Sequence, residues 1–461
     1  MDPESSHGER LTRRLRLSLP NVSGALSAVT AAVSEAGGIV HAIQSGQENS
    51  KRRVVELDLL MISQEQFAAI RNAIQQIDGV LIEGEPDLAL DAHRGGVITV
   101  QAKAPFRSEQ DFAAVYAPGA ARVAQAIART PTLVHSHTAV PRLVALITNG
   151  TAVLGLGNIG PRAAMPVLES KAVLLDTCVM ISGVPILLDT ADPQKIIETL
   201  LCIAPTFAAI CLEGIAAPVC FAVEDSLLEA MQTPVWHDDQ HGVAVVVLAA
   251  LLTLARRFQR SLNTLRIGLV GLGPSGIGIV KLLRHCGVEG VLGADDQAEA
   301  RVHHLLYGGQ PAAVEEVMEA AEVVIATGGA PGSIPPELVR RGQIIFALSE
   351  PAPEITPDVA LAAGARCAVD GRTLTSALAF PGLLRGALDA RLSRFTDSMK
   401  LAAAAAIARR TKAPALVPAV LDPVLHLRVA QAVQDVARRE EALVESTCSA
   451  PPEKELSYVT R

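Results

Sequence analysis

The segment around His237 carries the residues with the clearest chemical potential. Asp238 and Asp239 are adjacent carboxylates between two imidazoles, His237 and His241, and an almost wholly apolar run over residues 243–254 follows. The run predicts a buried helix whose first turn contains both aspartates. Carboxylates are stabilised by the dipole at a helix N-terminus, so capping is one explanation. A cation-binding or proton-transfer role is the other, and this segment alone does not decide between them.

A glycine-rich motif lies downstream. It has the form G-x-G-x-x-G and consists of Gly271, Gly273 and Gly276. An apolar strand pattern precedes it and a helical pattern over residues 277–283 follows, so a pyrophosphate could approach the helix N-terminus; Asp295 lies about twenty residues further on, where a ribose-binding acid is expected. Since an acid there repels a 2′-phosphate, the motif predicts NAD rather than NADP, with Ser275 as a further cofactor-binding residue. A glycine-rich turn without a ligand is the alternative, and Pro274 removes one amide donor.

The composition limits the class of protein. The chain has 461 residues, of which 49% are hydrophobic, so it is long enough for about three domains with sizeable cores. The net charge of −8 argues against binding to nucleic acid. A polar N-terminus and interrupted apolar runs argue against a signal peptide or a membrane span. The seven cysteines include no C-x-x-C pair, which is typical of reduced thiols in a cytoplasmic protein.

Residues 13–92 predict a separate domain. Strand and helix patterns follow one another in the ferredoxin-like order β-α-β-β-α-β, at residues 14–19, 25–36, 39–44, 53–61, 64–77 and 79–83. The loop over residues 19–26 resembles that of ACT regulatory domains, where a small ligand such as an amino acid often binds. Many domains of this fold only pair with one another in oligomers, so both a small effector and a structural role are possible.

The rest of the chain predicts an α/β architecture. Residues 93–260 favour a domain with a mainly parallel sheet, because short apolar strand patterns alternate with helical ones. The expected strands lie at residues 143–147, 171–175, 185–188 and 207–211. Residues 261–388 are expected to form the Rossmann-type dinucleotide-binding domain, and helices within residues 389–442 to pack back on the preceding α/β domain. The last residues are expected to form a mobile tail.

A second G-x-G-x-x-G lies within the expected α/β domain, at Gly155, Gly157 and Gly160. No acid follows it at the distance that a ribose-binding residue requires. The motif therefore favours a close-packed turn that lines an active site, rather than a second dinucleotide site.

Together these patterns resemble the bacterial type of NAD-dependent malic enzyme that carries an N-terminal ACT domain. The resemblance depends on ordered motifs, which include Tyr116-Ala-Pro-Gly119, Ser170-Lys-Ala172, Pro234-Val-Trp-His-Asp-Asp-Gln-His-Gly242, Leu378-Ala-Phe-Pro-Gly382 and Arg385-Gly-Ala-Leu-Asp389. It implies oxidation of the C2 hydroxyl of malate by NAD and loss of CO₂ from the ketoacid. A divalent metal, Mg²⁺ or Mn²⁺, would hold the developing enolate. It also implies a homodimer or a larger homo-oligomer.

The resemblance implies roles for individual residues. Lys171 matches the general base at the C2 hydroxyl, a role a lysine can fill when burial or a nearby cation lowers its pKa. Tyr116 matches the acid that protonates the enol carbon. Glu213 and Asp239 match two carboxylate ligands of the metal, and Asp238 matches the neighbouring carboxylate that assists proton transfer. A single lysine or tyrosine is usually packed or solvated, so only the joint pattern supports these roles.

Departures from the family pattern fall where substrate and metal are expected. Gly214 stands where a second acidic ligand is usual, Asn149 where an aspartate is usual, and Glu350 where a substrate-binding asparagine is usual. An asparagine-rich loop is shortened to residues 372–376, which end at Ser376. Because a like charge near a bound carboxylate is costly, malate is expected to bind poorly. The alternatives are therefore a degenerate homologue with a regulatory or scaffolding role, and an enzyme with an altered substrate.

Overall fold

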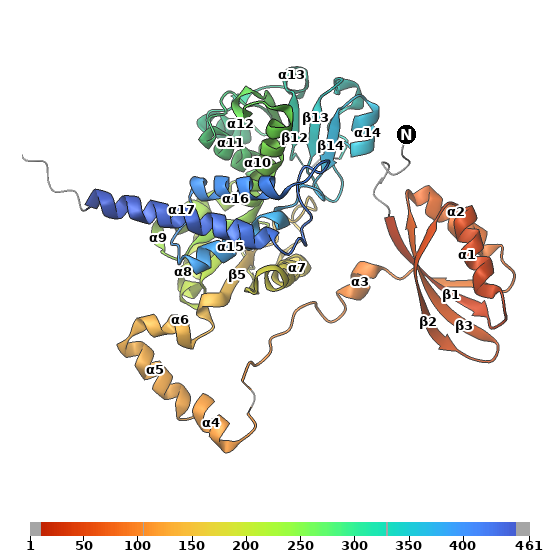
Figure 1. Cartoon of the computed structure of the whole chain (residues 1–461), viewed down its shortest axis with the longest axis horizontal. Helices are drawn as coiled ribbons and strands as arrows, with labels where there is room; N and C mark the ends of the chain where they lie inside the picture. Colours follow the sequence, from red (N-terminus) through yellow and green to blue (C-terminus); the bar gives the residue numbers. More distant parts are fainter. Residues whose placement is uncertain (1–10, 105, 329–330, 449–461) are drawn as a thin grey trace, which may run out of the picture. The chain divides into compact units, whose positions relative to one another are not determined.

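A computed structural model describes residues 11–104, 106–328 and 331–448 of the chain (Figure 1). The chain forms two compact units that divide between Val97 and Ile98. In the described residues the first unit contains one sheet and the second contains two.

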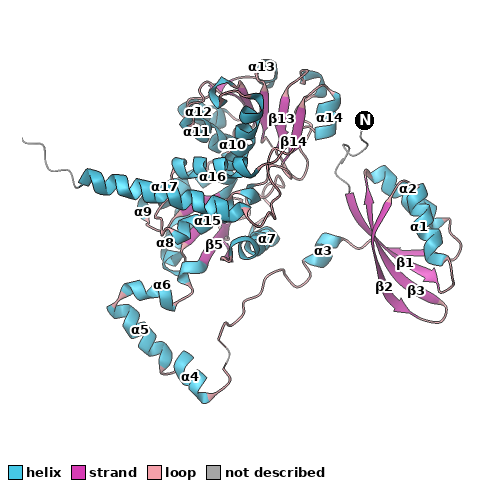
Figure 2. Ribbon diagram, in the orientation of Figure 1, coloured by secondary structure: helices cyan, strands magenta, loops and turns pink. Residues whose placement is uncertain are grey.

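The first unit is an antiparallel sheet covered on one face by the helices α1 and α2 (Figure 2). Its elements are β1 (Leu11–Pro20), α1 (Ala25–Glu35), β2 (Ile39–Glu48), β3 (Arg52–Met61), α2 (Gln64–Gln75) and β4 (Leu81–Gly84), followed by α3 (Leu88–Ala92). The strand order β2-β3-β1-β4 confirms the expected ferredoxin-like fold. Leu15, Leu17 and Leu57 are fully buried in one core with Val29 and Ile70. The likeness to an ACT domain stays a prediction.

The second unit begins with a segment of short helices that we call the arm, residues 98–142. Its elements are α4 (Glu109–Val115), α5 (Gly119–Arg129), η1 (Pro131–Leu133), α6 (Val134–His137) and η2 (Val140–Arg142). No residue in the described part of the arm is buried. Phe106, Phe112 and Val115 are exposed large apolar side chains, so the arm leaves apolar surface accessible to solvent.

A parallel sheet forms the middle of the second unit. Its strands are β5 (Leu143–Thr148), β6 (Ser182–Leu187), β7 (Ala209–Leu212) and β8 (Val235–His237), in the order β6-β5-β7-β8. Its helices are α7 (Pro161–Val179), α8 (Pro193–Ile203), η3 (Ala204–Thr206), α9 (Val219–Ala230) and α10 (Asp238–Phe258). The prediction of a strand at residues 171–175 is wrong, because this segment belongs to α7. Short apolar runs fit a strand and a buried helix equally well, and here Leu168, Ala172 and Leu175 form the buried face of a helix.

The next sheet is the dinucleotide-binding sheet expected after residue 260. Its strands are β9 (Ile267–Val270), β10 (Leu292–Ala294), β11 (Gln310–Pro311), β12 (Val323–Ala326), β13 (Ile344–Ala347) and β14 (Cys367–Asp370). Neighbouring strands run parallel in the order β11-β10-β9-β12-β13-β14, which is the order of Rossmann-type domains. The other elements are η4 (Leu262–Thr264), α11 (Pro274–His285), α12 (Ala298–Leu306), α13 (Val314–Ala320), η5 (Pro336–Leu338) and α14 (Pro357–Ala362). The expected strand, glycine turn and helix are therefore confirmed.

The C-terminal elements are η6 (Ser376–Leu378), α15 (Phe380–Asp389), α16 (Asp397–Arg410) and α17 (Leu425–Cys448). They complete the second unit: η6 and α16 pack against α10, and α17 packs against α15 and α16. By length and composition α10 could cross a membrane, but most of its side chains are buried in the core shared with α11 and α16, so α10 is a core helix. Arg256 near its end donates a hydrogen bond to the Ala408 carbonyl in α16 at 3.0 Å. The expected tail overlaps the end of α17, and its remainder lies outside the described residues.

Candidate active site

Lys171 lies in a buried cluster with two of the expected carboxylates. Its Nζ donates hydrogen bonds to Glu213 Oε2, at 2.7 Å, and to Asp238 Oδ2. Glu213 directly follows β7, and Asp238 directly follows β8 as the first residue of α10. These strands are parallel neighbours, so both carboxylates leave the sheet at the same edge. The structure therefore brings together three residues that the sequence assigned to catalysis and metal binding.

The charged side chains in this cluster shift one another's pKa values. Burial alone would lower the pKa of Lys171, but Asp238 and Glu213 raise it well above its usual value. Burial alone would raise the pKa of Asp238, but Lys171 lowers it. Burial and the nearby Asp239 raise the pKa of Glu213 to about 8. Lys171 is therefore an ammonium ion as long as its carboxylate partners are not neutralised by another cation.

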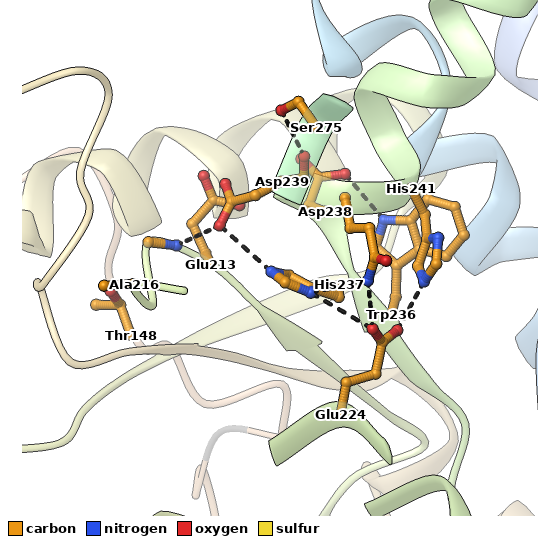
Figure 3. Close-up of polar contacts among 12 residues, drawn as sticks. Thr148, Glu213, Ala216, Glu224, Trp236, His237, Asp238, Asp239, His241 and Ser275 are labelled. Atoms are coloured by element: carbon orange, nitrogen blue, oxygen red, sulfur yellow. Dashed lines mark hydrogen bonds and ion pairs between the residues drawn. The ribbon is translucent and has the colours of Figure 1, made fainter. Parts of the chain in front are cut away.

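Two further residues fix the Asp238 carboxylate. Trp236 Nε1 donates to Asp238 Oδ1 at 2.9 Å, and Ser376 Oγ donates to Asp238 Oδ2 at 2.7 Å. Figure 3 shows the Trp236 indole beside Asp238. Ser376 belongs to the loop that is shorter than in the family pattern. Its hydroxyl helps to orient the carboxylate that contacts Lys171.

Asp239 connects the end of β7 to the cofactor-binding part of the unit. Its Oδ2 accepts a hydrogen bond from the Gly214 amide at 2.7 Å, and its backbone carbonyl accepts one from Ser275 Oγ at 2.7 Å (Figure 3). Gly214 has a φ of +62°, and a Cβ there would lie 3.1 Å from Thr148 Oγ1. The residue that replaces the usual acid thus contributes its backbone, in a conformation that disfavours a side chain.

A buried network behind Asp239 was not predicted from the sequence. Glu224 in α9 accepts a hydrogen bond from Gln240 Nε2 at 2.5 Å, and its other oxygen lies 2.6 Å from His241 Nε2. His237 lies between two carboxylates, 3.5 Å from Glu224 and 3.6 Å from Asp239 (Figure 3). Burial alone would lower the pKa of His237, but Asp239 and Glu224 raise it to about 10. Burial lowers the pKa of His241 to about 4. His237 is therefore a cation that supports Asp239.

The carboxylates of Glu213 and Asp239 fit a divalent cation of the hard, oxygen-preferring kind. They are close enough for Asp239 to raise the pKa of Glu213, and an added cation would relieve this repulsion. Among the described residues, no group of three or more His, Cys, Asp or Glu side chains is arranged to hold a metal ion. Two carboxylates would therefore leave the other positions to water and substrate oxygens, an arrangement that Mg²⁺ readily accepts.

The glycine turn has the shape expected of a dinucleotide site. A Cβ on Gly271, whose φ is +97°, would lie 2.4 Å from the backbone of Gly328, and one on Gly276 would lie 2.3 Å from the Gly271 carbonyl oxygen. A Cβ on Gly273 would meet no atom within 4 Å. Gly271 and Gly276 therefore permit close packing, and Gly273 leaves open space at the N-terminus of α11, where a pyrophosphate binds in such folds.

Asp295 and Ser275 complete this part of the site. Asp295 follows β10, and its Oδ2 accepts a hydrogen bond from the Leu272 amide at 2.7 Å, which holds the carboxylate against the glycine turn. This is the position expected for a ribose-binding acid. The Ser275 hydroxyl, expected to contact the cofactor, is bonded to the Asp239 carbonyl. It therefore joins the cofactor turn to the carboxylate cluster.

Tyr116 lies outside this cluster. It caps the C-terminal end of α4 in the arm, its ring centroid lies 5.2 Å from that of Phe112, and 63% of its surface is exposed. In the described residues, its hydrogen bonds and ring contacts do not reach Lys171. The structure therefore does not bring the expected acid to the expected base.

The loop with the second glycine motif is less closely packed than expected, because residues 154–158 are exposed and a Cβ on Gly157 or Gly160 would meet no atom within 4 Å. Three of the departures from the family pattern meet at this loop. A Cβ on Gly155 would lie 1.9 Å from the Glu350 carbonyl oxygen. The loop backbone donates a hydrogen bond to the Gly214 carbonyl at 2.9 Å. Asn149 Oδ1 accepts one from Thr151 Oγ1 at 2.7 Å. These residues hold one loop at the rim of the cluster.

Comparison with known proteins identifies the family. Residues 96–228 match the model of the malic enzyme N-terminal domain. The chain is 42% identical over 431 residues to NAD-dependent malic enzyme 1 of Bacillus subtilis, covering 93% of this chain and 98% of that protein. It is 36% identical to the NAD-dependent malic enzyme of Geobacillus stearothermophilus, covering 94% and 95%. A match over 93% of the chain has to include much of the ferredoxin-like unit.

Solved structures agree with this result. The NAD-dependent malic enzyme of Thermotoga maritima is 34% identical, with a TM-score of 0.71 over 76% of this chain and 99% of that one. The malic enzyme of Pyrococcus horikoshii is also 34% identical, with a TM-score of 0.70 over 75% of this chain and 88% of that one. The carboxylate cluster, the glycine turn and these matches lead to one conclusion: the chain belongs to the malic enzyme family.

Proposed function

We propose that the chain catalyses the NAD-dependent oxidative decarboxylation of malate to pyruvate and CO₂. The observation that carries this proposal is the position of Lys171 between Glu213 and Asp238, in a cluster that Ser275 connects to the glycine turn. This arrangement combines a titratable amine, carboxylates for a metal and a dinucleotide turn. NAD would bind at that turn, with Asp295 at its ribose. The relatives' names support the same reaction.

We assign proton transfer at the C2 hydroxyl of malate to Lys171. An amine accepts a proton only when it is neutral, and Asp238 and Glu213 hold the pKa of Lys171 well above its usual value. A divalent cation held by Glu213 and Asp239 would act as a Lewis acid toward substrate oxygens and offset the charge that faces the lysine. Asp238 holds the Lys171 amine in place and assists its proton transfer.

The test follows NADH formation with Mn²⁺ and malate. Lys171→Met should lower turnover at least about 100-fold, because a general base contributes about 10²–10⁴-fold to the rate, and should leave NAD binding unchanged. Lys195→Met, which alters an exposed lysine on α8, serves as the matched control with wild-type turnover. A wild type that forms no NADH from malate, or a Lys171→Met variant with full turnover, would contradict the proposal.

A degenerate homologue is not favoured, because Lys171, Glu213 and Asp238 are retained and in contact. The second candidate function is oxidation of a 2-hydroxy acid that carries an amine for Glu350 to pair with, since Glu350 stands where a neutral substrate-binding asparagine is usual. A panel of 2-hydroxy acids with and without an amine separates the two candidates. A higher kcat/KM for the amine-bearing acids would favour the altered substrate.

We also propose that the chain forms a homo-oligomer in which the arm packs against a second copy and Tyr116 protonates the enol. The exposed apolar side chains of the arm support this proposal. Light scattering should give a mass of at least two chains, and a monomer would contradict it. Mixing Tyr116→Phe with Lys171→Met subunits then tests where Tyr116 acts. Recovered turnover would mean that Tyr116 serves the active site of the second copy.

For the ferredoxin-like unit we propose a small effector, such as an amino acid, at the loop over residues 19–26. Gly24 in this loop has a φ of +86° and no atom within 4 Å of the place of a Cβ, which leaves room for a ligand. Calorimetry of the full chain with single amino acids tests this, and no saturable binding would contradict it. The sequence has no C-x-x-C pair, which supports a cytoplasmic location, and fractionation of the source cells would check this.

A further inference from the structure

Helices α16 and α17 form a cavity that the proposed reaction does not use. The two helices lie side by side (Figure 1), and the cavity between them has a volume of about 510 Å³. Ala402, Ala406 and Ala432 contribute small side chains to its wall. Their size leaves room between the helices, and the volume is in the range of small-molecule sites.

Arginines dominate the charged lining of this cavity, and they come from both helices: Arg409 and Arg410 from α16, and Arg428 and Arg439 from α17. Arg410 donates two hydrogen bonds to Asp422, at 2.6 and 3.1 Å, which fix its guanidinium. The guanidinium groups of the other three make no hydrogen bond or ion pair with any other described residue. Three guanidinium groups thus remain available to a ligand.

The carboxylate of the lining does not balance the positive charge of its arginines. Asp435 is the carboxylate of the lining, and it already accepts a hydrogen bond from Gln431 at 2.8 Å and lies 3.6 Å from Arg438. Like charges around one cavity repel each other, and the chain as a whole has a net charge of −8. A local concentration of arginines in an acidic protein is what an anion-binding site requires.

We propose that this cavity binds a small organic polyanion, with at least two carboxylate or phosphate groups. Guanidinium groups form paired hydrogen bonds with either kind of oxyanion, and arginines on opposing helices can engage two such groups at once. The apolar wall accommodates the carbon skeleton between them. This site is separate from the cluster of Lys171, and the inference does not depend on the proposed reaction.

The test is calorimetric titration of the full chain with citrate and with pyrophosphate, in a buffer free of phosphate and divalent metal. The variant Arg428→Ala/Arg439→Ala removes two guanidinium groups from the lining, and Arg409→Ala removes a third independently. Arg341→Ala is the control, since Arg341 is exposed and outside the lining. We expect one-to-one binding to wild type and to Arg341→Ala. Affinity should be at least about tenfold weaker in the double variant, because hydrogen bonds to charged groups are lost.

The anion that binds identifies the ligand class: citrate indicates a polycarboxylate, and pyrophosphate a phosphorylated compound. Binding should also weaken as salt is added. No saturable binding of either anion to the wild type would overturn the proposal, and so would unchanged affinity in both the double variant and Arg409→Ala. A third outcome would also overturn the proposal: the wild type binds neither anion, and the double variant changes the mass of the assembly in light scattering. The arginines would then belong to a protein interface.

Discussion

Metal binding is expected to weaken as the pH falls, because Glu213 must lose its proton to act as a ligand. Burial and Asp239 raise the pKa of Glu213 to about 8, so below this pH the incoming metal has to displace a proton. Each pH unit below about 8 should then lower the apparent affinity about tenfold, or ~1.4 kcal/mol. The affinity should change little above that pH. About two units lower, the loss reaches roughly 100-fold, or ~2.7 kcal/mol.

Calorimetric titration with Mn²⁺ at several pH values between about 6 and about 8.5 measures this slope, after correction for the ionisation of the buffer. Glu213→Gln should bind Mn²⁺ more weakly, with an affinity that no longer follows this slope. Asp176→Asn, which removes an exposed carboxylate from α7, should keep the wild-type slope. A wild-type affinity that is flat over this range would refute the reasoning, as would a slope that survives in Glu213→Gln.

Three further predictions concern single residues. Asp239→Ala should weaken Mn²⁺ binding at least about tenfold in the same titration, since one of two carboxylate ligands is lost, and an unchanged affinity would remove Asp239 from the metal site. Asp295→Asn should narrow the preference for NAD over NADP, measured as the ratio of kcat/KM values; a wild type that binds NADP as tightly as NAD would contradict this assignment. Gly214→Ala should lower the free energy of unfolding by roughly 1–2 kcal/mol from its positive φ alone, with a further loss from the Cβ contact at 3.1 Å. Gly287→Ala is the control, because Gly287 has a φ of +76° and no atom within 4 Å of the place of a Cβ. In denaturant titrations it should lose only the part of the free energy of unfolding that is due to the positive φ. Equal losses in the two variants would argue against an effect of the Cβ contact at Gly214.

The features that the sequence predicted well are those with a local signal. The turn at Gly271 requires a strand before it, glycines within it and a helix after it, and all three follow one another along the chain. The helix after Asp239 has an equally clear apolar pattern. The prediction of a strand at residues 171–175 is wrong because five mainly apolar residues are too few to show a period. Such a short run fits a strand and the second half of a helix equally well. The helix α7 begins at Pro161, ten residues before the segment in question.

The contacts that the sequence did not predict are between residues far apart in the chain. Glu224 had one weak signal, since it lies between Val223 and Leu227 on the buried face of α9, where a charged residue needs a partner. The sequence did not reveal that this partner is the histidine pair next to Asp239. Tyr116 shows the converse case. Its motif is local and clear, but the position of the arm depends on packing that its own sequence does not specify.

The hydrogen bond from Ser275 to the Asp239 carbonyl has a thermodynamic consequence. It joins the first turn of α11 to the first turn of α10, and nearby a Cβ on Gly278 would lie 2.1 Å from the Gln240 carbonyl oxygen, so the two helices touch through their backbones. A displacement of either turn is therefore passed to the other. Coupling between two bound ligands is reciprocal: a metal that tightens NAD binding by some factor is itself held more tightly, by the same factor, once NAD is bound. Affinities for the two ligands are thus properties of the pair, and each has a single value only when the occupancy of the other is stated.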